Sequence, residues 1–264
     1  MTLSLDVVTL GVPEVQAAHI FYKAAFSPTA ADHGRHVRLD LHGAGQVALH
    51  GIEALAADAQ AEPATSGFRG YVLSFIVSQP REVETVLNAA FQNGARVLKP
   101  AKKSLFAGFS AVYQAPDGAI WKLAAPIRKD TGPAGEPPLP TETALFLGVA
   151  EPNVSKVFYT ALGMIVDRDY GSKYVDFRLA PGTCRLGLLP RQVLAKDAGV
   201  GEAGTGFRAM VLTCETGSRA EVDALVAAAV SAGGRVAVAA GETEQGYSGH
   251  FTDPDGFLWK VVSA

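Results

Sequence analysis

The sequence contains PDGAIWK at residues 116–122 and, close to its end, PDGFLWK at residues 254–260. Two other motifs recur in the same order: FY at residues 21–22 returns at 158–159, and GFRGYVL at 67–73 returns as GFRAMVL at 206–212. The three offsets are 138, 137 and 139 residues. Because three independent matches fall at nearly one offset, the sequence predicts two tandem copies of one unit.

A stretch rich in proline and glycine separates the two copies. Proline fixes φ and lacks a backbone N–H, so this stretch cannot continue a helix or a central strand, and it is typical of a semi-rigid linker. We therefore expect a first unit at residues 1–125, a linker at 126–142 and a second unit at 143–264.

Each copy shows the same order of expected elements, read from apolar alternation in strands and from apolar spacing and end signals in helices. In the first copy these are strands at 5–12, 36–41, 46–49, 71–77, 97–98, 109–113 and 119–124, and helices at 14–26 and 81–92. Their counterparts in the second copy include strands at 144–149, 174–179 and 184–189, and helices at 151–162 and 219–232. The pattern indicates an α+β fold of four βαβββ modules.

Composition excludes several classes of function. The 264 residues carry a formal net charge of -3 and no basic stripe, so we expect neither nucleic acid nor a membrane surface as a partner. The two cysteines, Cys184 and Cys214, have no metal-type or redox spacing, which favours a reducing compartment. With no apolar run of membrane-spanning length and no signal-type start, we expect a cytoplasmic protein.

Three stretches carry a family resemblance: TLGVPEVQAAHIFY at residues 9–22, LFLGVAEPNVSKVFY at 145–159 and GYSGHFTDPDGFLWKV at 246–261. The first two resemble the opening module, and the third the closing hairpin, of the vicinal oxygen chelate superfamily, which includes glyoxalases, dioxygenases and bleomycin-resistance proteins. The resemblance implies U-shaped mixed β-sheets that curve around a cavity, with the helices outside.

The same resemblance locates the positions at which enzymes of the superfamily hold a divalent metal ion with His, Gln or Glu. Counted from the shared motifs, these positions are Val7, Ala48, Val72 and Lys122 in the first copy and Ala144, Gly187, Val211 and Lys260 in the second. A lysine ammonium has no lone pair, and the other side chains offer no donor atom. We therefore expect no metal and no other cofactor.

Candidate ligand-binding residues come from the same comparison. Lys122 and Lys260 would each face a cavity, where they would pair with an anionic group of a ligand; alternatively, each reaches the cavity mouth or a neighbouring acid. His50, two residues beyond Ala48, would lie beside Lys122. Phe109-Ser110 and Tyr247-Ser248 precede the two Asp-Gly turns, where they would contact a flat ligand or only build the hairpin.

Other repeated residues favour structural roles. Trp121 and Trp259 are expected to face away from the cavities and to pack under the helices. Arg69 and Arg208 are expected at solvated strand ends.

These observations predict a metal-independent protein that binds a small aromatic or anionic ligand in two clefts, in the manner of bleomycin-resistance-like proteins that sequester antibiotics. A pseudo-symmetric monomer would suffice, and a homodimer is compatible. The alternative is an enzyme, a glyoxalase-type lyase or isomerase or another member with a displaced active site, in which Lys122 or Lys260 acts chemically. A third reading is a scaffold with a filled cavity.

Overall fold

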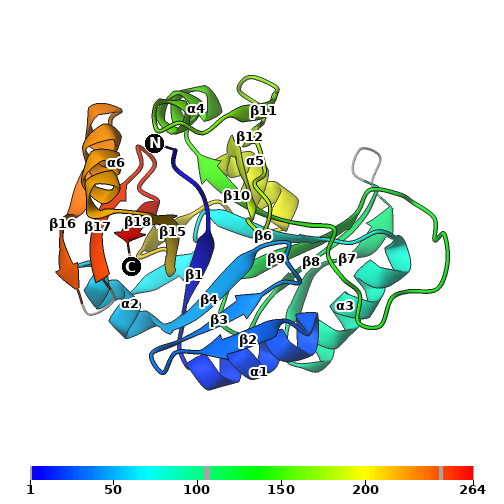
Figure 1. The fold of residues 1–264 in the computed structure, drawn as a ribbon. Coiled ribbons are helices and arrows are strands. Elements are labelled where there is room, and N and C mark those ends of the chain that lie inside the picture. The colour runs from blue at the N-terminus through cyan, green and yellow to red at the C-terminus, as the bar shows by residue number, and fades with distance from the viewer. Residues whose placement is uncertain (1, 104–107, 244–245, 264) are drawn as a thin grey trace.

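The described residues form two eight-stranded mixed β-sheets and one two-stranded sheet, with the four longest helices on the outer sides of the large sheets (Figure 1). The computed structural model describes residues 2–103, 108–243 and 246–263, so residue 1 of the first predicted unit and residue 264 of the second lie outside these ranges. The expected α+β class and the four βαβββ modules are confirmed. Within the described residues, no helix is both long and apolar enough to cross a lipid bilayer.

Each module is a strand, a helix and three further strands. The first copy contains β1 (Val7–Val12), α1 (Val15–Phe26), β2 (Thr29–Asp32), β3 (His36–Asp40) and β4 (Gln46–Gly51), then β6 (Tyr71–Ile76), α3 (Pro80–Gln92), β7 (Arg96–Lys103), β8 (Phe109–Gln114) and β9 (Ile120–Ala125). The second copy contains β10 (Glu142–Val149), α4 (Pro152–Ala161), β11 (Val166–Asp169), β12 (Val175–Phe177) and β13 (Arg185–Pro190), then β15 (Met210–Thr216), α6 (Arg219–Ser231), β16 (Arg235–Thr243), β17 (Gly246–Thr252) and β18 (Leu258–Ser263).

Each large sheet combines one module from each copy. The order in one sheet is β16-β17-β18-β15-β1-β4-β3-β2, and in the other it is β11-β12-β13-β10-β6-β9-β8-β7. We call them the β1 sheet and the β10 sheet. Antiparallel pairing of β1 with β15 and of β6 with β10 joins the copies. The division of the chain into units 1–125 and 143–264 stays a prediction. The two large sheets do not follow it, because each contains strands from both units.

Two matching sets of hydrogen bonds, one from each copy, lie inside the aromatic core. Tyr22 Oη donates to Asp117 Oδ2 at 2.7 Å, and Trp121 Nε1 donates to Tyr22 Oη at 3.3 Å. In the second copy Tyr159, Asp253 and Trp259 form the same arrangement, at 2.6 and 3.4 Å. Both tryptophans are buried on the helix side of their sheets, as expected. Because a buried hydroxyl or indole N–H needs a partner, these contacts fix how α1 and α4 pack on the last strands.

Residues 51–66 and 190–205 lie between the expected strands and are predicted from the sequence to be loops, but each contains a helix. These are α2 (Ile52–Asp58) and α5 (Arg191–Ala198), and a two-stranded sheet of β5 (Thr65–Gly67) and β14 (Gly204–Gly206) follows them. The loop prediction was wrong for both helices, because the alanine-rich composition of these segments favours helix. Leu55 and Ala56 of α2, like Leu194 and Ala195 of α5, are buried against the sheets.

The predicted linker is held in place by one polar side chain. Gln79 accepts from the backbone N–H of Thr131 at 2.8 Å and donates to the carbonyl of Pro133 at 2.9 Å. Gln79 is buried, so these bonds satisfy a group that would otherwise lose its water partners. The linker thus packs at the start of α3, and its last residue, Glu142, begins β10.

Asp253 gives the fold a measurable pH dependence. Burial raises the pKa of its carboxyl group to about 7, against the lowering effect of the bond from Tyr159. Asp253 therefore binds its proton more tightly in the folded state than in the unfolded chain, where the pKa of an aspartate is about 4. The resulting stabilisation is complete below pH about 4 and is lost as the pH rises to about 7.

We expect Asp253→Asn to flatten this decline. In urea unfolding followed by circular dichroism between pH 4 and pH 8, the wild-type free energy of unfolding should fall by up to about 4 kcal/mol more than that of the variant. Equal slopes for the two proteins would contradict the buried, proton-binding carboxyl group.

Candidate functional site

The concave face of the β1 sheet encloses a cavity of about 510 Å³. Its wall comes from both copies, because β1, β3 and β4 meet β15, β17 and β18 there, and α2 covers one side. The lining residues are Val7, Thr9, His36, Arg38, Ala48, His50, Leu55, Asp58, Val211, Thr213, Glu215, Thr216, His250, Lys260 and Val262. The site is therefore completed only when the two copies pair.

Four of the positions implied by the family resemblance meet in this cavity: Val7, Ala48, Val211 and Lys260. Three of these side chains have no donor atom, and the fourth is a cation, so the set does not fit a divalent metal ion. Within residues 2–103, 108–243 and 246–263, no group of three or more His, Cys, Asp or Glu side chains is placed to hold one.

Lys260 and His250 form the polar centre of the cavity. They lie opposite each other on the neighbouring strands β18 and β17, and Asp58 of α2 lines the same space. Burial, and after it the charge of Lys260, lowers the pKa of His250 to about 4. Burial also lowers the pKa of Lys260, against the opposing effect of Asp58. His250 is therefore a neutral imidazole near pH 7 beside a buried amine.

A row of histidines continues along β3 and β4. The rings of His36 and His50 stack with centroids 6.3 Å apart, and His33 lies 4.9 Å from His36. His50 Nδ1 is 3.1 Å from the carbonyl oxygen of Gly51. Burial, and then the charges of His33 and His50, lower the pKa of His36. This side of the cavity therefore favours the uncharged imidazole of His36.

A second cavity of about 320 Å³ adjoins the first. It shares Asp58, His250 and Lys260 with the larger cavity and adds Ser248 and part of β16. Ser248 Oγ and His250 Nδ1 are buried and make no hydrogen bond to any described residue. Because an unmatched buried polar atom is costly, the pair marks a place where a polar group of a ligand or a water molecule would be stabilised.

The equivalent face of the β10 sheet is filled by the protein's own side chains. The ring of Phe146 covers Gly187, since a Cβ there would approach Phe146 Cδ1 to 2.7 Å. Leu194 and Ala198 of α5 pack against Val72 in one apolar cluster. The two faces are therefore not equivalent, unlike the two clefts expected from the sequence, because Phe146 stands where the β1 sheet has Thr9 and its ring fills the space over Gly187, the counterpart of Ala48.

Lys122 pairs with a neighbouring acid, which is the structural alternative expected for it from the sequence. Its Nζ donates to Asp197 Oδ2 at 2.6 Å, at the end of α5. His50 lies beside Lys260 and not beside Lys122, so that expected pairing was also wrong. The physical reason is the crossing of the copies, which puts β4 in one sheet and β9 in the other.

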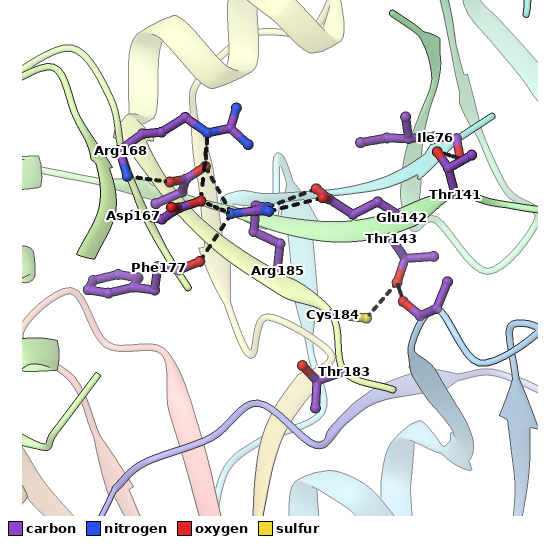
Figure 2. A network of polar contacts seen from close by, with 12 residues as sticks. Ile76, Thr141, Glu142, Thr143, Asp167, Arg168, Phe177, Thr183, Cys184 and Arg185 are labelled. Carbon is purple, nitrogen blue, oxygen red and sulfur yellow. Dashed lines mark hydrogen bonds and ion pairs between the residues drawn. The ribbon is translucent and has the colours of Figure 1, made fainter. Parts of the chain in front are cut away.

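An ion network occupies the far end of the same face. Figure 2 shows the Arg185 guanidinium between Glu142 and Asp167, whose carboxylates accept at 2.8 and 2.7 Å. The carboxylate of Asp176 is completely buried and lies 3.6 Å from Arg185 Nη1 and 3.3 Å from Arg168 Nε. Charges that are paired in this way hold the face closed rather than leave it open to a ligand.

The two aromatic-Ser pairs divide between the faces of their strands. Phe109 is buried in the main core, and the hydroxyl of Tyr247 donates to Asp223 of α6 at 2.9 Å. Because successive side chains point to opposite faces, the serines face inward and the aromatics cannot stack on a ligand there. Ser248 lines the smaller cavity, whereas Ser110 lies on the filled β10 sheet.

Sequence reasoning missed Asp58, His36 and His250 as neighbours of Lys260. His36 and Arg38 point to the same face of β3, and His36 lies opposite His50 on β4. Predicting that β3 pairs with β4 would therefore have placed both histidines on one face. Asp58 was missed because α2 was expected to be a loop. His250 has Val112 as its counterpart in the first copy, so it is not one of the repeated residues from which a site was predicted.

Comparisons with known proteins agree on the fold. Residues 143–261 match the Glyoxalase/Bleomycin resistance protein/Dioxygenase superfamily. Glyoxalase I from Zea mays shares 18% identity over 99% of this chain and 92% of its own, with a TM-score of 0.64. A Bacillus subtilis protein provisionally described as a dioxygenase shares 11% identity over 99% of this chain and 85% of its own, with a TM-score of 0.65. No curated protein matches the sequence.

We expect the titration of His250 to report the charge of Lys260. In Lys260→Met the pKa of His250 should rise from about 4, because a repelling cation is removed, yet stay below 6.5, because burial remains. Histidine resonances followed by NMR against pH measure this. Lys122→Met, on the other sheet, is the matched control and should leave His250 unchanged. An unshifted His250 in Lys260→Met would contradict the arrangement.

Proposed function

We propose that the chain binds a small organic molecule in the β1 sheet cavity without a metal ion. The proposal proceeds from the match of residues 143–261 to the glyoxalase/bleomycin resistance protein/dioxygenase superfamily and from the fold that the chain shares with glyoxalase I. The observation that carries this proposal is the pair of unmatched buried polar atoms, Ser248 Oγ and His250 Nδ1, beside Lys260.

The cavity has the mixture of surfaces that a ligand site needs. Val7, Ala48, Leu55, Val211 and Val262 form apolar walls. Covering the apolar part of a ligand with such walls contributes roughly 25 cal/mol per Å² before the cost of ordering. A volume of about 510 Å³ falls within the range of small-molecule sites.

Polar groups at the centre favour a ligand with one acidic group. Lys260 supplies a cation and the neutral His250 a hydrogen bond, and the hydroxyl of Ser248 supplies another from the adjoining smaller cavity. Arg38, at the other end, is paired with Glu215 at 2.8 Å, so it is less able to pair with a ligand. An aromatic carboxylate, with its ring against the valines and its acid at Lys260, fits this distribution best.

The proposed stoichiometry is one ligand per chain. The β10 sheet carries the same module design, but Phe146, α5 and the Lys122–Asp197 ion pair occupy its concave face. Because one chain supplies both halves of each sheet, a pseudo-symmetric monomer is sufficient for binding. Bleomycin-resistance-like sequestration is the form of binding that we propose.

A glyoxalase-type lyase or isomerase with a displaced active site is the second candidate. The buried Lys260 favours it, because burial lowers the pKa of its amine toward the range in which an amine exchanges protons with a substrate. The closing positions that hold a metal in enzymes of the superfamily are lysines here, so no step of this reaction is assigned to a metal.

The binding proposal predicts one affinity change in a matched pair of variants. Calorimetry with 2-naphthoate should show one site in the wild-type protein, at least tenfold weaker binding to Lys260→Met, and wild-type binding to Lys122→Met. Thermal unfolding of each variant controls for loss of fold. Equal weakening in both variants, or binding of the neutral 2-naphthamide as tightly as the acid, would contradict a ligand acid at Lys260.

Metal analysis of the same protein, before and after incubation with Zn²⁺, Ni²⁺, Mn²⁺ and Fe²⁺, separates the two candidates. The binding proposal predicts no stoichiometric metal and no turnover of dicarbonyl substrates. Turnover of a dicarbonyl substrate that Lys260→Met abolishes would establish the enzyme instead, and one tightly held ion per chain would contradict metal-independent binding.

A further inference from the structure

A crevice of about 400 Å³ lies outside both sheet cavities, where the two copies meet. It is bordered by β5, β14 and the start of α5, and three arginines line it: Arg69, Arg191 and Arg208. One carboxylate, Asp255, lines it as well. The crevice thus gathers more positive than negative charge in a chain whose formal net charge is -3.

Two of the guanidinium groups are held very close together. Arg191 Nη1 and Arg208 Nη1 each lie 2.2 Å from the place that a Cβ on residue 70 would occupy, so the two nitrogens lie within twice that distance of each other. Residue 70 is a glycine with φ of +87°, a conformation that glycine adopts readily. Any larger residue there would displace both groups.

Uncharged partners orient these side chains. Arg191 donates to the carbonyls of Glu202 and Phe68, at 3.0 and 2.6 Å. Arg208 donates to the carbonyls of Arg69 and Asp255, at 3.1 and 2.7 Å. Each guanidinium also lies over an aromatic ring, Phe68 for Arg191 and Phe257 for Arg208. The two cations are therefore fixed before any ligand arrives.

Among the described residues, carboxylates lie near these two cations but form no direct ion pair with them. In the described ranges, no salt bridge joins Arg191 or Arg208 to an acidic side chain. The Asp255 carboxylate accepts instead from Ala150 N at 2.7 Å and from Ser155 Oγ at 2.6 Å. Burial, and then the charge of Arg191, lowers the pKa of Arg208 against the opposing charges of Asp253 and Asp255. Two like charges are thus held together in a place that an anion would stabilise.

The other half of the pseudo-symmetric molecule lacks this pair. Arg69 and Arg208 are equivalent, and each donates to the carbonyl of its own copy's Asp-Gly turn. That shared bond explains these two arginines structurally. At the positions equivalent to Arg191 and Gly70, however, the protein has Ile52 and Ala209, so neither the second guanidinium nor the space for it is present. Fold symmetry therefore does not require Arg191.

We propose that Arg191 and Arg208 form a binding site for an oxyanion, the phosphate or carboxylate group of a small molecule, at the junction of the two copies. Guanidinium groups suit such anions because their N–H donors match pairs of oxygen atoms. The site is separate from Lys260 and its cavity, so it does not depend on the function proposed above.

Inorganic phosphate is the probe for this site. In calorimetry at constant ionic strength, the wild-type protein should bind one phosphate, and Arg191→Ile, which installs the residue of the other copy, should bind it at least tenfold more weakly. Arg96→Ile removes an exposed arginine from the outer strand β7 and is the matched control, with wild-type affinity expected. Circular dichroism and thermal unfolding establish that both variants are folded.

A competition series then distinguishes the sources of the anion. Glycerol phosphate and citrate are compared with phosphate at equal ionic strength, and tighter binding of one of them identifies a phosphomonoester or a carboxylate as the ligand. Equal phosphate binding by wild type, Arg191→Ile and Arg96→Ile would overturn the proposal. So would a wild-type protein that binds none of the three anions, because the arginine pair would then have a structural role only.

Discussion

The pairing of β1 with β15, and of β6 with β10, is the constraint on which the rest of the structure depends. These antiparallel ladders satisfy the backbone N–H and C=O groups of the first strand of every module, which would otherwise be left unpaired at a buried edge. Each sheet consequently takes half of its strands from each copy. Neither concave face exists within a single copy, and the linker makes the association of the copies intramolecular.

Once both faces are built by one chain, their residues can differ. On the β1 sheet, small side chains at Thr9 and Ala48 leave room, and the cavity collects His50, His250 and Lys260. On the β10 sheet, Phe146 lies over Gly187, while Arg185 and its acids fill the end of the face. The same backbone thus supports one open and one filled site, because the volume and charge of a few inward side chains decide which forms.

The same asymmetry recurs where the copies meet. The bonds from Arg69 and Arg208 to the two Asp-Gly turns preserve the repeat, whereas Arg191 with Gly70 departs from it. The core shows a third variation: Asp117 and Asp253 bind Tyr22 and Tyr159, although Asp117 aligns with Asp255 in the repeated motif. Equivalent packing was therefore kept by an acid two residues away, and the aligned Asp255 binds Ala150 N and Ser155 Oγ instead.

Repetition and periodicity in the sequence indicated the fold, and the family resemblance indicated part of the cavity wall. Val7, Ala48, Val211 and Lys260, counted from the shared motifs, all line the cavity, although the sequence assigned the first two to one copy's site and the last two to the other's. The period of two that marks strands, applied to Phe109-Ser110 and Tyr247-Ser248, would have separated aromatic from hydroxyl. Local patterns thus determined which side chains face inward.

Only the tertiary structure decided which inward side chains meet. His50 joins Lys260 rather than Lys122, Asp58 arrives on α2, and Arg191 reaches Arg208 across the junction of the copies. Each of these contacts links distant parts of the chain, and its partners follow from which strands pair between copies. Pairing within a copy and pairing between copies satisfy the same local pattern, so the choice rests on the packing of the whole molecule.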